Sequence, residues 1–193
     1  HLPSFELIEK QWLPQQLGKD GGHLHVWSVG CSSGEEAWSL AMVLHRFFSG
    51  CWGKANFGIS ASDVSQAALA TARAAVYPVE RLTEIPLEYR ADYIEMVSDT
   101  TFRPVELLHH RVGFVRVNLL QAGSAPLQRL NLIFCQNVLI YFSRERRLRL
   151  LDGLAGLLGP GGLLIIGSCD IGLWNHPALQ RVAWPGTLAY LKN

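Results

Sequence analysis

The sequence has no long apolar run and no marked excess of charge of either sign. A helix that crosses a bilayer needs about 20 consecutive apolar residues, and no run in these 193 residues reaches that length. The formal net charge is only +1, whereas a nucleic-acid-binding surface is clearly basic. The first residues lack the charged and apolar regions of a secretory signal peptide. We therefore expect a cytoplasmic protein without membrane insertion and without a nucleic-acid partner.

Cysteine is scarce and widely spaced. The four cysteines are Cys31, Cys51, Cys135 and Cys169, with no C-x-x-C pair among them. This spacing does not match a zinc site, and a disulfide framework is not expected in a chain of this length. Cys31, Cys135 and Cys169 fall in or just after predicted strands, which favours small buried residues over reactive thiols. The sequence predicts no metal site.

The elements that are present alternate along the chain. Hydrophobic residues make up 49% of it and charged residues 17%, which is typical of one compact domain spanning 1–193. The patterns predict helices near 5–17, 35–49, 65–76 and 144–158, and strands at 25–30, 57–62, 112–117, 131–136 and 162–168. Strands that alternate with helices predict a parallel sheet with helices on both faces.

The chain ends on two short runs that break this alternation. They cover 179–184 and 187–192 and are separated by Pro185-Gly186, a turn pair, so we expect an antiparallel hairpin. A parallel α/β sheet that ends in a hairpin is typical of the class I S-adenosylmethionine (SAM)-dependent methyltransferase fold, a Rossmann-like fold. A plain dinucleotide-binding sheet does not end in this way.

The stretch between Tyr77 and Arg111 is too long for a simple connection. It is interrupted by prolines and carries much of the charge of the chain. We expect an inserted subdomain at 78–111 that contains a helix and short strands, with Phe102–Val105 and Gly113–Val117 as strand candidates. His109 and His110 are predicted to lie on its solvated surface.

A glycine-rich loop joins the first predicted strand to the next helix. Gly30 and Gly34 allow positive φ and let a ligand approach the backbone. Glu35 and Glu36 then open the helix, where two carboxylates would repel a pyrophosphate. The loop therefore favours an uncharged or cationic ligand over a dinucleotide, and SAM, with its sulfonium and ammonium groups, fits this requirement.

Polar residues follow the other strands, where ligands bind in such sheets. Asp63 can accept hydrogen bonds from both ribose hydroxyls, or it can cap the helix that begins near Ser65. Asn118 and Leu119 can bind the edge and face of an adenine, although Asn118 can equally be a turn residue.

Several motifs together resemble the CheR-type chemoreceptor methyltransferases. They include Ser33-Gly-Glu-Glu-Ala-Trp-Ser-Leu-Ala, Ala61-Ser-Asp-Val, Asn118-Leu-Leu, Phe134-Cys-Gln-Asn-Val-Leu-Ile-Tyr-Phe and Leu158-Gly-Pro-Gly-Gly. The resemblance runs from about residue 3 to the last strand, and Asn-Val-x-Ile-Tyr-Phe is its most specific part. It implies a SAM-binding domain with an inserted β-subdomain, which methylates glutamate side chains on the cytoplasmic helices of methyl-accepting chemoreceptors. From this resemblance we expect the chain not to include the N-terminal helical domain that is usual in the family.

The resemblance also implies roles for individual residues. Glu35 would bind the methionine end of SAM, Asp63 the ribose, and Asn118 with Leu119 the adenine. The cofactor would also be lined by Gly30, Cys31, Gln136 and Asn137, and Tyr141 would face the incoming glutamate as the catalytic residue. Gln136 stands where the family commonly has arginine.

The expected reaction needs no general base, because a glutamate carboxylate with a pKa near 4.3 is already ionised at neutral pH. Two other functions remain open from the sequence. One is a SAM-binding sensor or scaffold without turnover, and the other is a small-molecule methyltransferase on the same fold. The arginines that follow Ser143 are interpreted as a solvated helix face, and the protein is expected to be a monomer.

Overall fold

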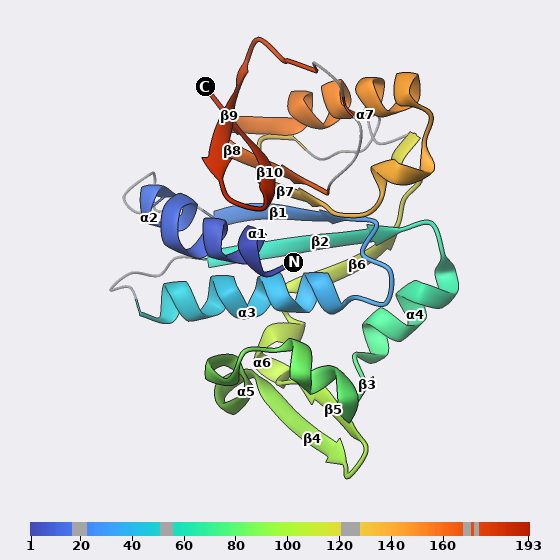
Figure 1. The fold of residues 1–193 in the computed structure, drawn as a ribbon. Helices are drawn as coiled ribbons and strands as arrows, with labels where there is room; N and C mark the ends of the chain where they lie inside the picture. The colour runs from blue at the N-terminus through green and yellow to red at the C-terminus, as the bar shows by residue number, and fades with distance from the viewer. Residues whose placement is uncertain (17–22, 51–55, 121–127, 168–170, 172–173) are drawn as a thin grey trace.

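The computed structural model describes residues 1–16, 23–50, 56–120, 128–167, 171 and 174–193 (Figure 1). Its centre is a seven-stranded sheet in the order β6-β2-β1-β7-β8-β10-β9. The strands are β1 His23–Val29, β2 Asn56–Asp63, β6 Val112–Arg116, β7 Leu130–Cys135, β8 Leu158–Ile166, β9 Leu179–Trp184 and β10 Thr187–Lys192. β1 therefore lies inside the sheet, between β2 and β7.

The pairing confirms the predicted fold class. β1 runs parallel to β2 and β7, β6 runs parallel to β2, and β8 runs parallel to β7. β10 is antiparallel to both β8 and β9, so the last two strands form the predicted hairpin at one end of the sheet.

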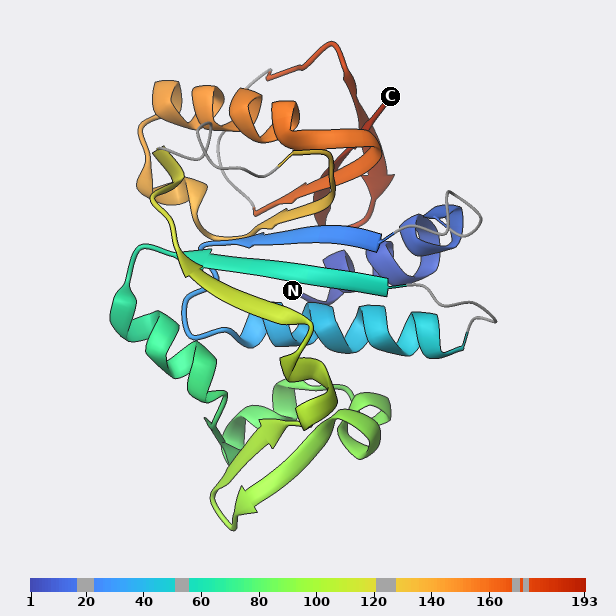
Figure 2. The ribbon, with the colours of Figure 1, turned by 180° about the vertical axis from the view of Figure 1, so that it is seen from behind.

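Helices cover the two faces of this sheet. α3 Glu35–Ser49 and α7 Arg144–Leu157 lie on opposite sides of β1, and α4 Gln66–Ala74 follows β2 (Figures 1 and 2). Side chains alternate between faces along a strand. Val26 accordingly packs in the cluster that contains Leu40 of α3, whereas Trp27 packs in the cluster that contains Leu151 of α7.

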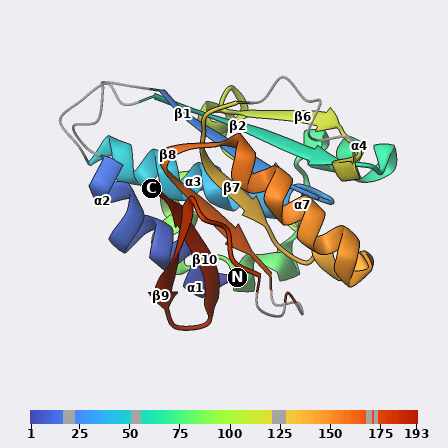
Figure 3. The ribbon, with the colours of Figure 1, turned by 90° about the horizontal axis from the view of Figure 1, so that it is seen from above.

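A continuous helical segment opens the chain and packs against its end. It consists of α1 Leu2–Leu7, the π-helical turn η1 Ile8–Trp12 and α2 Leu13–Gln16. It begins at Leu2 rather than near residue 5, because proline is well tolerated in a first helical turn. The indole Nε1 of Trp12 donates to the Gly161 carbonyl at 3.1 Å, and α1 contacts β10 (Figure 3).

The fifth parallel strand is longer than predicted. β8 begins at Leu158 instead of 162, and its pairing with β7 shifts between Leu130 and Leu132. The Gly-Pro-Gly-Gly stretch thus forms an irregular strand start and not a turn. At Gly162 a Cβ would lie 2.8 Å from the Leu130 carbonyl oxygen, so only glycine allows this approach.

A second sheet of three strands in the order β3-β5-β4 lies beyond α3 (Figure 2). This region comprises β3 Tyr77–Pro78, the 3-10 helix η2 Val79–Glu84, α5 Leu87–Tyr93, β4 Ile94–Ser98, β5 Thr101–Pro104 and α6 Glu106–His109. Of the two strand candidates, Phe102–Val105 overlaps β5. The other, Gly113–Val117, overlaps β6, which pairs with β2 in the main sheet. This confirms the strand predicted at 112–117 and places it outside the small sheet.

The prediction of a solvated His109 is also wrong. Its ring packs on Trp38, with centroids 4.8 Å apart, and its Nε2 donates to the Pro104 carbonyl at 3.2 Å. His110 is exposed. Tertiary packing of α6 on α3 thus decides the environment of one of two adjacent histidines.

Cys31 and Cys135 are buried, as predicted, whereas Cys51 and Cys169 lie outside the described residues. No helix in the described ranges is both long and apolar enough to cross a bilayer. Over the same ranges, no three His, Cys, Asp or Glu side chains form a metal-binding group.

Leu132 provides a test of the core. Its side chain is fully buried in β7, between β1 and β8, so Leu132→Ala should lower the free energy of unfolding by about 2–5 kcal/mol. The matched control is Leu87→Ala, because Leu87 is 74% exposed and its truncation should change stability by less than about 0.5 kcal/mol. Urea denaturation measures both values, and equal losses would contradict this description of the core.

Candidate functional site

The loop after β1 has a conformation that depends on glycine. Gly30 has φ +67°, and Gly34, which caps α3, has φ +95°. A Cβ at Gly30 would lie 2.2 Å from Cγ2 of Val138, so the loop after β7 lies directly against this backbone. The Tyr77 hydroxyl donates to the Ser33 carbonyl at 2.7 Å and fixes the loop from the side of the small sheet.

Asp63 joins this loop to the end of β2. Its Oδ2 accepts from the Ser32 backbone N–H at 2.9 Å, and its Oδ1 accepts from the Ser65 N–H at 2.8 Å. The helix cap is Ser65 itself, whose Oγ accepts from the Ala68 N–H. Each carboxylate oxygen can accept a further hydrogen bond, so the Asp63 carboxylate can both hold the loop and bind ligand hydroxyls.

Cys31 contributes a backbone hydrogen bond and a small buried side chain to the loop after β1. Its N–H donates to the Ser62 carbonyl at 2.9 Å, and the residue is buried. Burial, reinforced by the nearby Asp63 carboxylate, raises the pKa of the Cys31 thiol to about 12. The thiol therefore stays protonated at neutral pH and is not a nucleophile.

The two glutamates that open α3 differ in their surroundings. The Ser33 hydroxyl donates to Glu35 Oε2 at 2.8 Å, and the Ser28 hydroxyl donates to Glu36 Oε1 at 2.6 Å. Burial raises the pKa of Glu36 to about 8 although the Ser28 hydrogen bond opposes this shift. At neutral pH Glu36 is therefore mostly protonated.

Asn118 and Leu119 follow β6. Asn118 Oδ1 accepts from the Leu120 N–H at 3.0 Å and closes a local turn, the role that the sequence left open beside adenine binding. Leu119 is buried in the core cluster on the α7 face. It also lines a groove with Leu120, Arg146 and Arg149.

The segment after β7 holds the remaining predicted residues. Gln136 Nε2 donates to Ser4 Oγ at 3.4 Å, which directs this amide toward α1. Asn137 has a left-handed backbone with φ +57°. Tyr141, on the 3-10 helix η4 Leu139–Tyr141, is 82% exposed.

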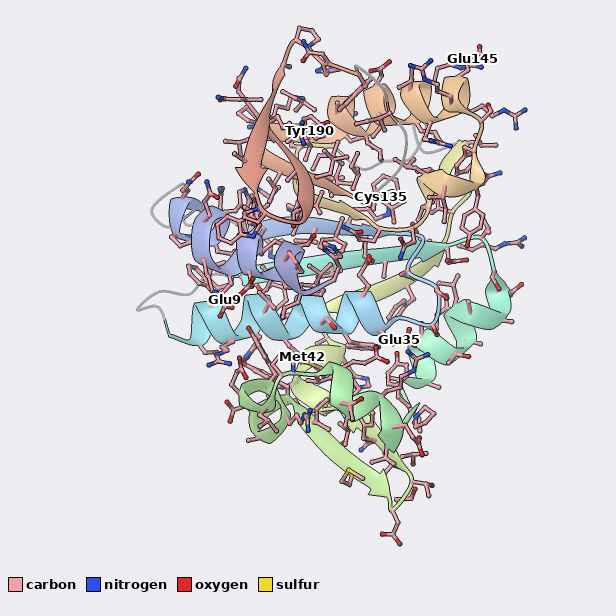
Figure 4. All side chains as sticks on the ribbon, in the orientation of Figure 1. Glu9, Glu35, Met42, Cys135, Glu145 and Tyr190 are labelled. Carbon is pink, nitrogen blue, oxygen red and sulfur yellow. The ribbon has the colours of Figure 1, made fainter. Side chains whose placement is uncertain are left out.

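A cavity of about 470 Å³ opens beside these loops. It lies between the N-terminal helical segment, α3 and the small sheet, and Figure 4 labels Glu9, Met42 and Glu35 along it. Of the predicted site residues, Glu35, Gln136 and Asn137 line this cavity. Those that do not are Gly30, Cys31, Asp63, Asn118, Leu119 and Tyr141.

Two further residues belong to the site. Glu36 lines the cavity, although the sequence indicated only an acidic helix start. Tyr77 also lines it while holding the Ser33 carbonyl; from the sequence it was placed only at the edge of the irregular stretch. Its contact with the loop crosses 44 positions of sequence and could not be read from local pattern.

Comparison with known families gives a match over most of the chain. The model of the "CheR methyltransferase, SAM binding domain" family matches residues 1–179. A chemotaxis protein methyltransferase from Borreliella burgdorferi is 31% identical over 172 residues, which are 86% of this chain and 60% of that protein. Chemotaxis protein methyltransferase 1 from Pseudomonas aeruginosa is 34% identical over 170 residues, which are 86% of this chain and 62% of that protein. The chain thus spans about three fifths of the length of these relatives.

Solved structures support the fold. Magnesium protoporphyrin IX methyltransferase from Synechocystis PCC 6803, crystallised with bound SAM, aligns with a TM-score of 0.54 at 13% identity, over 100% of this chain and 81% of that chain. The DszA carbon methyltransferase aligns with a TM-score of 0.51 at 16% identity, over 84% of this chain and 34% of that chain. At these identities the likeness concerns the fold alone.

Glu36→Gln tests the protonation of the buried carboxyl. The folded protein, with a Glu36 pKa of about 8 against an ordinary 4.5, holds one more proton than the unfolded chain between these values. The free energy of unfolding should therefore fall as pH rises through this window, by at most about 1.4 kcal/mol per pH unit from this group, and level off above it. Glutamine has no proton to lose, so this part of the fall should be missing from the variant. Urea unfolding from about pH 5 to about pH 9 compares the two proteins, and parallel curves would rule out the raised pKa.

Proposed function

The chain belongs to the family of CheR methyltransferase SAM-binding domains, and on that premise we propose that it is a protein-glutamate O-methyltransferase. It transfers the methyl group of SAM to glutamate side chains on the cytoplasmic helices of a methyl-accepting chemoreceptor. The observation that carries the proposal is the family match over residues 1–179, whose motifs lie in the loops after β1, β2 and β7. In this proposal 78–111 is an inserted subdomain, and the enzyme acts in the cytoplasm as a monomer.

The residues present suit the charge pattern of SAM. Carboxyl groups of Glu35 and Glu36 line the cavity at the start of α3, where an ammonium or sulfonium group is favoured and a pyrophosphate is repelled. Asp63 Oδ1 and Oδ2 retain acceptor capacity for ribose hydroxyls. In the proposal Glu35 binds the methionine end and Asp63 the ribose. Asn118 and Leu119 contact the adenine, and Gly30, Cys31, Gln136 and Asn137 make the remaining contacts with the cofactor.

The bound cofactor supplies an electrophilic methyl group. The protein has to align the acceptor oxygen with that carbon and exclude water from the acceptor carboxylate. No side chain has to remove a proton, since the acceptor is ionised at neutral pH. Gln136 contributes no positive charge, and Tyr141, with its exposed ring, contacts the incoming glutamate.

Asp63→Asn tests the cofactor site. The amide leaves one acceptor oxygen of two, so it cannot hold the Ser32 N–H and both ribose hydroxyls together. We expect SAM and S-adenosylhomocysteine to bind at least about tenfold more weakly, a loss of about 1.4 kcal/mol. Calorimetric titration measures the affinity, with Asp99→Asn, an exposed residue of the β4–β5 turn, as the control. Unchanged affinity in the Asp63 variant would remove this residue from the site.

Methyl-ester formation tests the reaction itself. Incubation with methyl-labelled SAM and a chemoreceptor cytoplasmic fragment should give base-labile methanol from the fragment. Tyr141→Phe should lower kcat/KM about 10-fold or more without changing SAM affinity, because its hydroxyl contacts only the acceptor in this proposal. SAM binding without any methyl ester would instead favour a non-catalytic SAM-binding domain.

A further inference from the structure

The cavity carries more negative charge than the cofactor requires. Its charged lining consists of Glu6, Glu9, Glu35, Glu84 and Glu88 against Lys10 and Arg81, whereas Glu36, which is mostly protonated at neutral pH, adds little charge. Both of these cations are already paired, Lys10 with Glu6 at 2.7 Å and Arg81 with Glu84 at 2.9 Å. A carboxylate acceptor that entered this cavity alone would therefore meet unbalanced charge of its own sign.

Tyr89 adds an unsatisfied polar group to the same cavity. The residue is only 7% exposed, and its hydroxyl has no hydrogen-bond partner among the described residues. Buried hydroxyls are normally hydrogen-bonded, and the neighbouring Glu9 carboxylate is the chain's own candidate acceptor for this one, so a ligand group that donates to both oxygens would complete the pair. Burial, followed by the Glu9 carboxylate, raises the pKa of Tyr89 to about 12, so the hydroxyl keeps its proton. Arg46 stacks on the ring at 4.7 Å and donates to the Glu88 carbonyl.

Glu9 approaches Tyr89 from the N-terminal helical segment. It lies in the π-helical turn η1, a geometry that is frequent at functional sites. Figure 4 shows Glu9 and Glu35 toward opposite ends of α3, with Met42 between them, and all three line the cavity. The Glu9 end is therefore separate from the proposed cofactor contact at Glu35. Met42 and Phe102 are apolar residues of the same lining.

We infer that Glu9 and Tyr89 form a subsite for a lysine or arginine side chain that the acceptor protein carries next to the glutamate to be methylated. Its charged head donates to the Glu9 carboxylate and to the Tyr89 oxygen, and its aliphatic stem lies along Met42 and Phe102. The positive charge offsets the acidity that the acceptor carboxylate would otherwise meet. This inference rests on the proposed function, and it adds a requirement on the sequence around the acceptor.

The test compares two alanine-based helical peptides that share a central glutamate. One has arginine a single helical turn away on each side, and the other has the uncharged isostere citrulline at both positions. Binding is measured by fluorescence anisotropy in the presence of S-adenosylhomocysteine, whose own affinity is measured separately. Wild-type protein should bind the arginine peptide at least about tenfold more tightly. Glu9→Gln and Tyr89→Phe should each reduce that preference at least about threefold, with S-adenosylhomocysteine affinity unchanged.

Glu145→Gln is the matched control, since this glutamate is exposed on α7 and should leave the preference intact. Equal binding of both peptides, no binding of either, or an unchanged preference in the Glu9 and Tyr89 variants would overturn the inference. The inference would also fail if free butylguanidinium competed with peptide binding while the protein showed no preference between the two peptides, because the subsite would then bind a small cation. Failure of the wild-type protein to bind S-adenosylhomocysteine would instead count against the proposed function.

Discussion

The parallel register of β1 with its two neighbours is the constraint on which the site depends. Val29 lies beside Ser62 of β2, and Ser28 lies beside Phe134 of β7. The three strands therefore end at the same level, and their following loops meet. A slip of one residue would exchange the faces of Val26 and Trp27 and would separate the Cys31 N–H from the Ser62 carbonyl. The hydrogen bond from the Ser32 N–H to Asp63, which joins the loop after β1 to the end of β2, is possible only in this register.

Charge at this edge of the sheet is arranged in two ways. The Asp63 carboxylate accepts hydrogen bonds from two backbone N–H groups, which hold it in place. Among the described residues, the hydrogen-bond partner of the Glu36 carboxyl is the Ser28 hydroxyl, and burial favours its neutral form. A cation bound beside Glu36 would favour the ionised form and stabilise its own binding, so occupancy and proton release are linked at this position. Of the two glutamates at the start of α3, Glu36 is therefore the one whose protonation depends on the bound ligand.

Local patterns were sufficient for the elements with clear beginnings and ends. The bounds of α3 follow from Gly34 and the glutamates after it, and the β9–β10 hairpin follows from Pro185-Gly186. Local pattern failed where a distant contact decides the outcome. The start of β8 depends on pairing with Leu130, and the burial of His109 depends on Trp38. In the candidate site the loop residues could be chosen by type, but the protonation of Glu36 and the approach of Glu9 to Tyr89 arise only from packing.

The contact of α1 with β10 has a consequence for how the chain folds during synthesis. Ser4 lies beside Thr187 and Trp12 binds the carbonyl of Gly161, so these contacts of the first helical segment form only after β8 and β10 have been made. β1 likewise waits for β7, more than a hundred residues later. A ribosome-bound fragment that lacks the β9–β10 hairpin would keep the contact of η1 with α3 but would leave α1 without β10. Such a topology makes synthesis of the β9–β10 hairpin a condition for closing the core, and it leaves long nascent fragments exposed to chaperones and proteases until β10 emerges.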